Sequence, residues 1–145
     1  MAQIKSSITI NRPIEEVFAF AADPSNDLKW RSDVVESKVT SGPLGVGATF
    51  QFASEFMGRK IETIGEITAY DPPKRFAWKS TKSPIPVSAV TTFEAVADGT
   101  LVVDTADFEP GGFFKIAEPL LMKQAQSAAE KDMKKLKELL EKRAL

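Results

Sequence analysis

The sequence predicts an α+β domain in which a curved, seven-stranded antiparallel sheet is covered by one long C-terminal helix. Three observations support this fold class. Most of the chain alternates apolar and polar residues, the connections between these stretches are as short as hairpin turns, and a helical pattern runs from about residue 118 to 143. Sequential hairpins give antiparallel sheets, and a sheet with one apolar face needs a cover. Only the final helix is long enough to supply it.

The N-terminal part predicts one strand followed by two short helices. Residues 4–10 alternate strictly, with isoleucines on one face and polar residues on the other. Pro13, followed by two glutamates, is typical of the first turn of a helix, where proline loses no hydrogen bond and acidic groups meet the positive end of the dipole. Asp23-Pro24-Ser25-Asn26 ends this helix, and a second short turn leads to Trp30.

Six further strands are expected, separated by glycine- and proline-containing turns. They cover residues 35–40, 48–56, 61–70, 75–80, 89–93 and 100–108. In the first of them we expect Val35, Ser37 and Val39 to share one face. Gly65 lies inside a strand, which indicates a bulge or a sharp bend. The strand over 100–108 is apolar on both faces, so its register stays open.

The final helix carries one apolar stripe with a stretch of small residues in its middle. The stripe consists of Leu121, Ala125, Ala129, Met133, Leu136 and Leu140. Its alanines indicate that the helix either approaches the sheet closely or leaves room for a ligand. Pro119 suits a first helical turn, so residues 113–118 are expected to form a separate turn or short helix.

Composition limits the chemistry and the partners. The 145 residues are expected to form a single domain, 1–145. The formal net charge of −1 makes nucleic acid an unexpected partner. Without Cys or His, disulfides, thiolate nucleophiles and ordinary zinc sites are absent, and we expect no metal and no cofactor. No signal peptide or membrane-spanning stretch is evident, so we expect a cytoplasmic protein, and a homodimer remains open.

Three stretches stand out together: PIEEVFAFAADPSNDLKW (13–30), SGPLGVGATFQ (41–51) and EITAYDPPKRFAWKS (66–80). In their order and spacing they resemble the START-like superfamily, also called SRPBCC, and within it the polyketide cyclase/dehydrase-like group. The resemblance includes DGT at 98–100 and the final helix, so it extends over essentially the whole chain. It implies a helix-grip fold, with the sheet wrapped around the C-terminal helix and an apolar cavity between them. Family members include carriers of hydrophobic ligands, aromatase/cyclases and cochaperone-like proteins, so the fold does not select a function.

The candidate ligand-binding residues are mainly aromatic side chains on the apolar strand faces and apolar residues near the start of the final helix. They are Trp30, Phe50, Phe52, Phe56, Phe76, Trp78, Phe93, Phe108, Phe113, Phe114, Leu120, Leu121, Gln124 and Ala125. Taken singly, each strand aromatic is more simply explained by a packed core. Small residues such as Ser54, Thr63, Gly65, Ala89 and Thr91 would keep a cavity open. Phe113, Phe114, Ile116 and Leu120 are more than one helical stripe can bury, and we expect them to form the cavity entrance.

Candidate catalytic groups depend on the register of residues 100–108. One register turns Asp104 inward with Thr100, Val102, Ala106 and Phe108, and the other turns Asp107 inward. A carboxylate buried among apolar residues would have a raised pKa and could act as an acid or base. A solvated edge-strand position is the simpler explanation of each aspartate, and Tyr70 is most simply a strand-end residue.

Three functions are therefore open. The favoured one is binding of a small hydrophobic ligand, aromatic, polyketide-like or lipid-like, between sheet and helix. The second is a cyclase- or dehydratase-like enzyme that uses the same cavity without a metal or a covalent nucleophile. The third is a protein interaction module, with the apolar residues around Phe113 as its contact surface.

Overall fold

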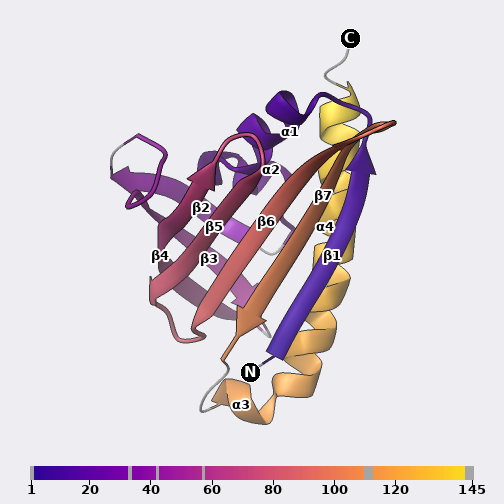
Figure 1. Ribbon diagram of the computed structural model, residues 1–145. Helices are drawn as coiled ribbons and strands as arrows, with labels where there is room; N and C mark the ends of the chain where they lie inside the picture. Colours follow the sequence, from indigo (N-terminus) through magenta and orange to yellow (C-terminus); the bar gives the residue numbers. More distant parts are fainter. Residues whose placement is uncertain (1, 33, 42, 57, 110–112, 143–145) are drawn as a thin grey trace.

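The computed structural model describes residues 2–32, 34–41, 43–56, 58–109 and 113–142. Its strands are β1 (Ala2–Ile10), β2 (Val34–Ser41), β3 (Thr49–Phe56), β4 (Arg59–Asp71), β5 (Arg75–Lys82), β6 (Val87–Val96) and β7 (Gly99–Phe108). Its helices are α1 (Ile14–Ala21), the 3₁₀ turn η1 (Pro24–Asn26), α2 (Asp27–Trp30), α3 (Phe113–Ile116) and α4 (Glu118–Lys142). The strands form one antiparallel sheet in the order β1-β7-β6-β5-β4-β3-β2, and the expected fold class is confirmed (Figure 1).

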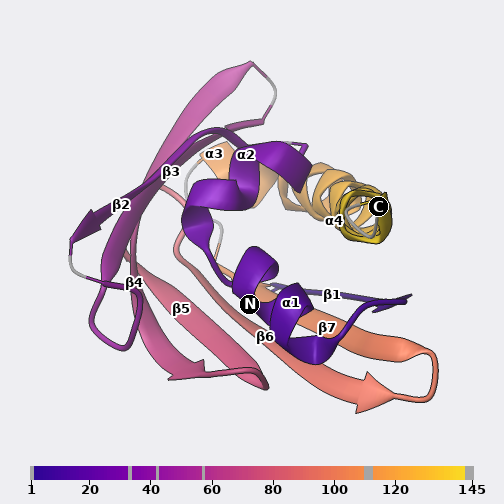
Figure 2. The same cartoon turned by 90° about the horizontal axis from the view of Figure 1, so that it is seen from above.

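The sheet curves around the helices. Seen from above, it bends from β1 through β7, β6 and β5 to β2, with α1, α2 and α4 on the concave side (Figure 2). Helix α4 runs along β1, and the short α3 precedes it as a separate element, as expected (Figure 1). This arrangement follows from the alternation in the strands, because the apolar residues of every strand must share one face to be covered.

Polar contacts fix α4 along β1. The Lys137 Nζ group donates to the Thr9 carbonyl at 2.9 Å, and the Gln126 amide donates to the Lys5 carbonyl at 3.1 Å. On its inner side the helix buries Met133, Leu136 and Leu140. The C-terminal half of α4 thus seals one end of the concave face, and its N-terminal half carries the expected alanines.

Buried residues form two apolar clusters at opposite parts of the concave face. The larger cluster joins α1, Trp30, Phe50, Phe76 and Phe93 to the C-terminal half of α4. The smaller cluster consists of Ile61, Ile85 and Leu121, with Phe108 and Ala117 packed against it. Two separate clusters under one curved sheet indicate that the apolar interior is not continuous.

Gly65 gives an aromatic ring room to lie on the sheet. Gly65 pairs with Phe50 across β3 and β4, and a Cβ atom built on it would lie 2.7 Å from the tip of the Phe50 ring. The pairing of β4 with β5 also shifts register between Ile64 and Gly65, so the expected irregularity is present. The glycine therefore sets how deeply the Phe50 ring can pack.

One expectation for β2 is wrong. The alternation predicts Val35 on the same face as Ser37 and Val39, but the side chain of Val35 is 42% exposed. The pairing of β2 with β3 shifts between Val34 and Glu36, so the alternation is interrupted there. A bulge cannot be detected from the alternation of a single strand.

Asp132 ties α4 to the loop that follows α2. Its carboxylate is buried, with 4% of the residue exposed, and accepts a 2.9 Å hydrogen bond from the backbone N–H of Ser32. We expect Asp132→Ala to lower the free energy of unfolding by about 1–3 kcal/mol, because the loop loses this charge-assisted bond. Urea denaturation measures the change, and Lys134→Ala, at an exposed position of α4, is the control. Equal stability of the two variants would contradict the role of Asp132.

Candidate functional site

A cavity of about 190 Å³ lies between the two apolar clusters. Its walls come from strands β2 to β7, from the end of α1, from the η1–α2 segment and from the N-terminal half of α4. The apolar lining residues are Ala21, Pro24, Val34, Phe50, Phe52, Ile61, Phe76, Trp78, Ile85, Val87, Ala89, Ala106, Phe108, Leu121 and Ala125. The volume exceeds the roughly 150 Å³ of an engineered cavity that holds a benzene ring. A single ring or a short alkyl chain therefore fits.

Three aromatic rings form one wall. Phe50 and Phe52 stack with ring centroids 6.1 Å apart, and the Trp78 indole lies edge-on to both, at 5.3 and 5.5 Å. Phe50 and Phe52 share one face of β3, and Trp78 is on β5, which is separated from β3 by β4, so the sheet itself sets their spacing. Such mutually packed rings lose little side-chain freedom when a ligand binds.

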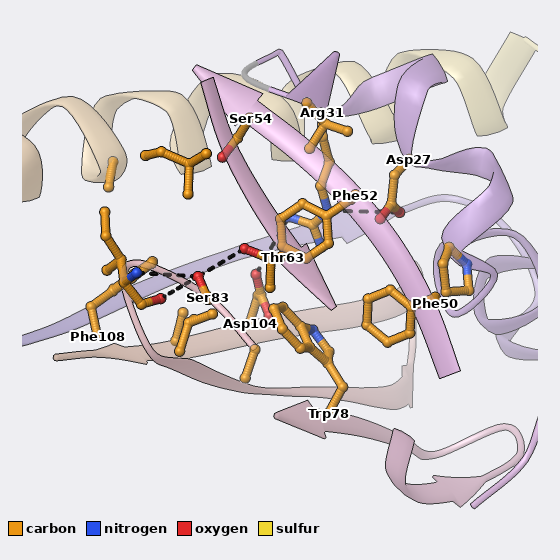
Figure 3. A pocket seen from close by; sticks show the side chains of 18 of the residues that line it. Asp27, Arg31, Phe50, Phe52, Ser54, Thr63, Trp78, Ser83, Asp104 and Phe108 are labelled. Carbon is orange, nitrogen blue, oxygen red and sulfur yellow. Dashed lines mark hydrogen bonds and ion pairs between the residues drawn. The ribbon is translucent and has the colours of Figure 1, made fainter. Parts of the chain in front are cut away.

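A set of charged side chains connects the end of α2 with β7 inside the cavity. The guanidinium of Arg31 lies between two carboxylates, with Nε 3.8 Å from Asp27 Oδ1 and Nη1 3.9 Å from Asp104 Oδ2 (Figure 3). Thr91 donates a 2.9 Å hydrogen bond to the other oxygen of Asp104. The Arg31 and Asp104 side chains are only 27% and 15% exposed. Together these groups give the cavity a polar, charged centre.

A second polar network lies where β4 meets the loop before β6. The Ser83 hydroxyl donates to the Ile85 carbonyl at 2.9 Å and accepts from the Ile85 N–H at 3.2 Å. It also contacts the Thr63 hydroxyl at 2.9 Å (Figure 3). Because Ser83 has only one hydroxyl hydrogen, Thr63 must be the donor in this contact. Toward any other neighbour, the Thr63 hydroxyl can then act only as a hydrogen-bond acceptor.

The cavity reaches solvent beside Glu55 and Gln124. Both residues line it and both are exposed, whereas most other lining residues are buried or half-buried. Glu55 lies near the end of β3, and Gln124 lies in the second turn of α4. The opening is therefore between the end of β3 and the N-terminal half of α4.

The structure places most of the predicted ligand-binding residues at the cavity. Those that line it are Phe50, Phe52, Phe76, Trp78, Phe108, Leu121, Gln124 and Ala125. Of the small residues expected to keep the cavity open, Ser54, Thr63 and Ala89 line it, whereas Gly65 and Thr91 do not. The side chains of Phe56, Phe113 and Phe114 lie outside the described part of the structure.

Three predicted residues lie elsewhere. Trp30 is buried in the larger cluster, with the Arg31 guanidinium 4.0 Å from its ring centroid. Phe93 belongs to the same cluster, and its ring lies 5.1 Å from that of Phe18 on α1. Leu120 is 49% exposed, and the α4 residues that line the cavity are Leu121, Gln124 and Ala125. Helix α1 covers Phe93, and Leu120 is on the far side of α4 from the apolar stripe, so neither reaches the cavity.

Of the candidate acid–base groups, Asp104 alone lines the cavity among the described residues. Strand β7 has the register in which Thr100 and Val102 are buried and Asp104, Ala106 and Phe108 line the cavity. Asp107 instead accepts a 3.0 Å hydrogen bond from the Gln3 amide. Tyr70 packs edge-on against Phe18 and Phe76. Asp107 and Tyr70 are therefore placed away from the site.

Arg31 and Asp27 line the cavity but were not predicted from the sequence. The sequence does indicate that these two residues could form an ion pair, because an acidic and a basic residue four positions apart on a helix are neighbours. The spacing could not show that this pair faces the interior. Four residues do not define an apolar face, so only the tertiary structure orients α2.

Two glutamates near the C-terminal end of α4 have lowered pKa values. Hydrogen bonding from Lys142 lowers the pKa of Glu138, and hydrogen bonding from Lys137 and from the Asn11 N–H lowers the pKa of Glu141. Both glutamates are near the C-terminal end of α4, where they pair with lysines one turn away. These shifts reflect surface ion pairing and attachment of the helix to the end of β1.

Two further findings concern metal ligands and membrane-spanning helices among the described residues. No group of three or more carboxylate, His or Cys side chains there is arranged to hold a metal ion. In the same part of the chain, none of the helices combines the length and the apolar character needed to cross a bilayer.

Comparison with known proteins gives one family and many similar structures. The chain superposes on TTHA0849 from Thermus thermophilus with a TM-score of 0.86 at 21% identity, covering 99% of this chain and 100% of the other. For the ZhuI aromatase/cyclase from Streptomyces sp. R1128 the TM-score is 0.80 at 15% identity, with 99% and 96% covered. A conserved protein from Geobacillus kaustophilus gives 0.78 at 19% identity, with 97% and 96% covered. At these identities the similarity shows the shared fold.

The search of curated proteins gave no significant match. The family model described as "Polyketide cyclase / dehydrase and lipid transport" matches residues 1–141. The match extends over nearly the whole chain and agrees with the curved sheet and long C-terminal helix. The chain therefore belongs to the polyketide cyclase/dehydrase and lipid transport family.

Proposed function

We propose that this protein binds one small hydrophobic molecule, with an aromatic ring or a short alkyl chain, in the cavity between the sheet and α4. The observation that supports this most strongly is the cavity itself, about 190 Å³ in volume and lined by rigid aromatic and aliphatic side chains. Burial of apolar surface supplies the driving force, at roughly 25 cal/mol per Å² of area removed from water. The few polar lining groups would orient the ligand.

The family and the fold support this proposal at a coarser level. The matching family model covers both cyclases or dehydrases and lipid transport. One similar structure is an aromatase/cyclase by its own description. Ligand binding is common to these activities, since a cyclase must also bind its substrate. Binding is therefore the part of the function that the family makes most plausible.

A cyclase- or dehydratase-like activity in the same cavity is the second candidate. The specific observation in its favour is Asp104, a carboxylate in the cavity wall with a guanidinium 3.9 Å away and a threonine hydroxyl bound to its second oxygen. Asp104 could accept a proton from a carbon or hydroxyl group of a folded substrate, and Arg31 could stabilise the oxyanion that forms. Purified protein incubated with a reactive polyketone short enough to form a single ring in this cavity should then give a cyclised product that Asp104→Asn does not give.

The binding proposal is tested with the purified full-length protein and benzyl alcohol. After solvent extraction of any co-purified molecule, checked by native mass spectrometry, we expect saturable binding of one benzyl alcohol per chain by calorimetry. For so small a ligand the dissociation constant should be roughly 1 mM or tighter. A sugar of similar size, which has no apolar face to bury, is the control and should not bind. Non-saturable heats with benzyl alcohol would contradict the proposal.

A further inference from the structure

The charges that line the cavity are unbalanced. Among the described lining residues, carboxylates come from Asp27, Glu55 and Asp104, and the single cation is Arg31. Arg31 lies between Asp27 and Asp104 at 3.8 and 3.9 Å, so its one positive charge is shared by two negative ones. The polar centre therefore has a net charge of −1, and Glu55 adds a further negative charge at the opening.

Two of the polar groups that line the cavity, Asp104 and Thr63, offer acceptor sites to a ligand. Asp104 uses one oxygen to accept from Thr91, and its second oxygen lies 3.9 Å from Arg31 Nη1, beyond hydrogen-bond distance of that atom. An ionised carboxylate has about four acceptor sites, so capacity remains. Thr63 donates its hydroxyl hydrogen to Ser83, because Ser83 donates its own to the Ile85 carbonyl. Thr63 can therefore only accept from a ligand.

The negative charge and the acceptor groups of the cavity both disfavour a ligand that carries a carboxylate. A ligand carboxylate entering the cavity would meet Asp27 and Asp104 and would have to compete with them for the one guanidinium. Like charges within a few ångströms of each other repel much more strongly in a partly buried site than in bulk water, because the effective dielectric constant is lower there. A hydroxyl or ammonium group would instead donate to acceptors that are already in place, without this repulsion.

We propose that the cavity takes ring compounds bearing a hydrogen-bond donor, such as an alcohol or an amine, and excludes carboxylates, fatty-acid head groups among them. This rests on the proposed function, because it concerns the same cavity. Arg31 then acts as the group that holds the two aspartates together across the cavity. It does not serve as an anchor for an anionic ligand. In Figure 3 Asp104 and Thr63 are drawn in the middle of the pocket, between the aromatic wall and Phe108.

The test uses three probes of nearly equal size: benzyl alcohol, benzylamine and benzoate, titrated into the full-length protein at pH 7 and low salt. We expect benzyl alcohol and benzylamine to bind and benzoate to bind at least about tenfold more weakly than benzyl alcohol. Equal or tighter binding of benzoate would overturn the inference while leaving the proposed function standing. Failure of all three probes to bind would instead contradict the proposed function.

Two charge variants test whether the weaker binding of benzoate is caused by the cavity residues or by the net charge of the protein. Asp104→Asn removes one negative charge from the lining and should improve benzoate binding relative to benzyl alcohol by at least about threefold. Glu62→Gln changes the net charge of the protein by the same amount, but Glu62 is an exposed residue of β4 that does not line the cavity. It should leave the ratio unchanged. An equal change in both variants would mean that the net charge of the protein excludes benzoate, and the assignment to Asp104 would be wrong.

Discussion

Ala106→Phe is expected to abolish binding of benzyl alcohol while leaving the protein folded. Ala106 lines the cavity from β7, between Asp104 and Phe108 on the same strand face. A phenylalanine ring placed there has the size of the ligand and would occupy most of a cavity of about 190 Å³. We expect affinity to fall at least about 100-fold by calorimetry. The free energy of unfolding should change little, because the new ring fills space and does not displace packed atoms.

The matched control is Ala95→Phe. Ala95 is an exposed residue of β6 outside the cavity lining, so the same substitution adds the same ring to the surface. Benzyl alcohol binding should be preserved. If Ala106→Phe is unfolded by circular dichroism, Ala125→Leu fills the cavity from α4 and takes its place. A folded cavity-filling variant that still binds benzyl alcohol would show that the ligand lies elsewhere.

Leu136→Ala should cause a large loss of stability. Leu136 is fully buried, at 0% exposure, and joins α4 to the larger apolar cluster. Truncating a buried leucine removes apolar contacts and leaves a void, which costs about 2–5 kcal/mol. Urea or thermal denaturation should detect this directly. For a chain of this size the melting temperature should fall by about 2–4 °C for each kcal/mol lost.

Leu120→Ala is the control on the same helix. Leu120 is 49% exposed and does not line the cavity, so its truncation should change stability by at most about 0.5 kcal/mol. A loss comparable to that of Leu136→Ala would show that Leu120 packs against part of the protein. The sequence predicts Leu120 at the cavity entrance, but it lies on the far side of α4 and does not line the cavity, so release rates of benzyl alcohol from this variant should also stay unchanged.

The fold could be predicted from the sequence because its elements carry strong local patterns. Strict alternation in β1 and the long apolar stripe of α4 each identify an element without reference to the rest of the chain. The boundary at Pro119 likewise separates α3 from α4. By contrast, β7 is apolar on both faces, and only its pairing with β1 and β6 determines that Asp104 faces the cavity.

The cavity residues were less predictable, for a physical reason. Phe76 and Phe93 look alike in sequence, as aromatic residues on the inner face of neighbouring strands, yet Phe76 lines the cavity and Phe93 does not. What separates them is the position of α1, whose Phe18 ring packs against Phe93. Alternation determines which face a side chain occupies. It does not determine which part of that face another element covers.

The central claim is that a small ring compound binds inside the cavity, and the two tryptophans allow a direct test. Trp78 lines the cavity, whereas Trp30 is buried in the larger cluster and does not. In a ¹H–¹⁵N spectrum the two indole N–H signals can be assigned with Trp78→Phe. Addition of benzyl alcohol should shift the Trp78 signal saturably and much more than that of Trp30. Saturable binding by calorimetry with an unchanged Trp78 signal would contradict the claim.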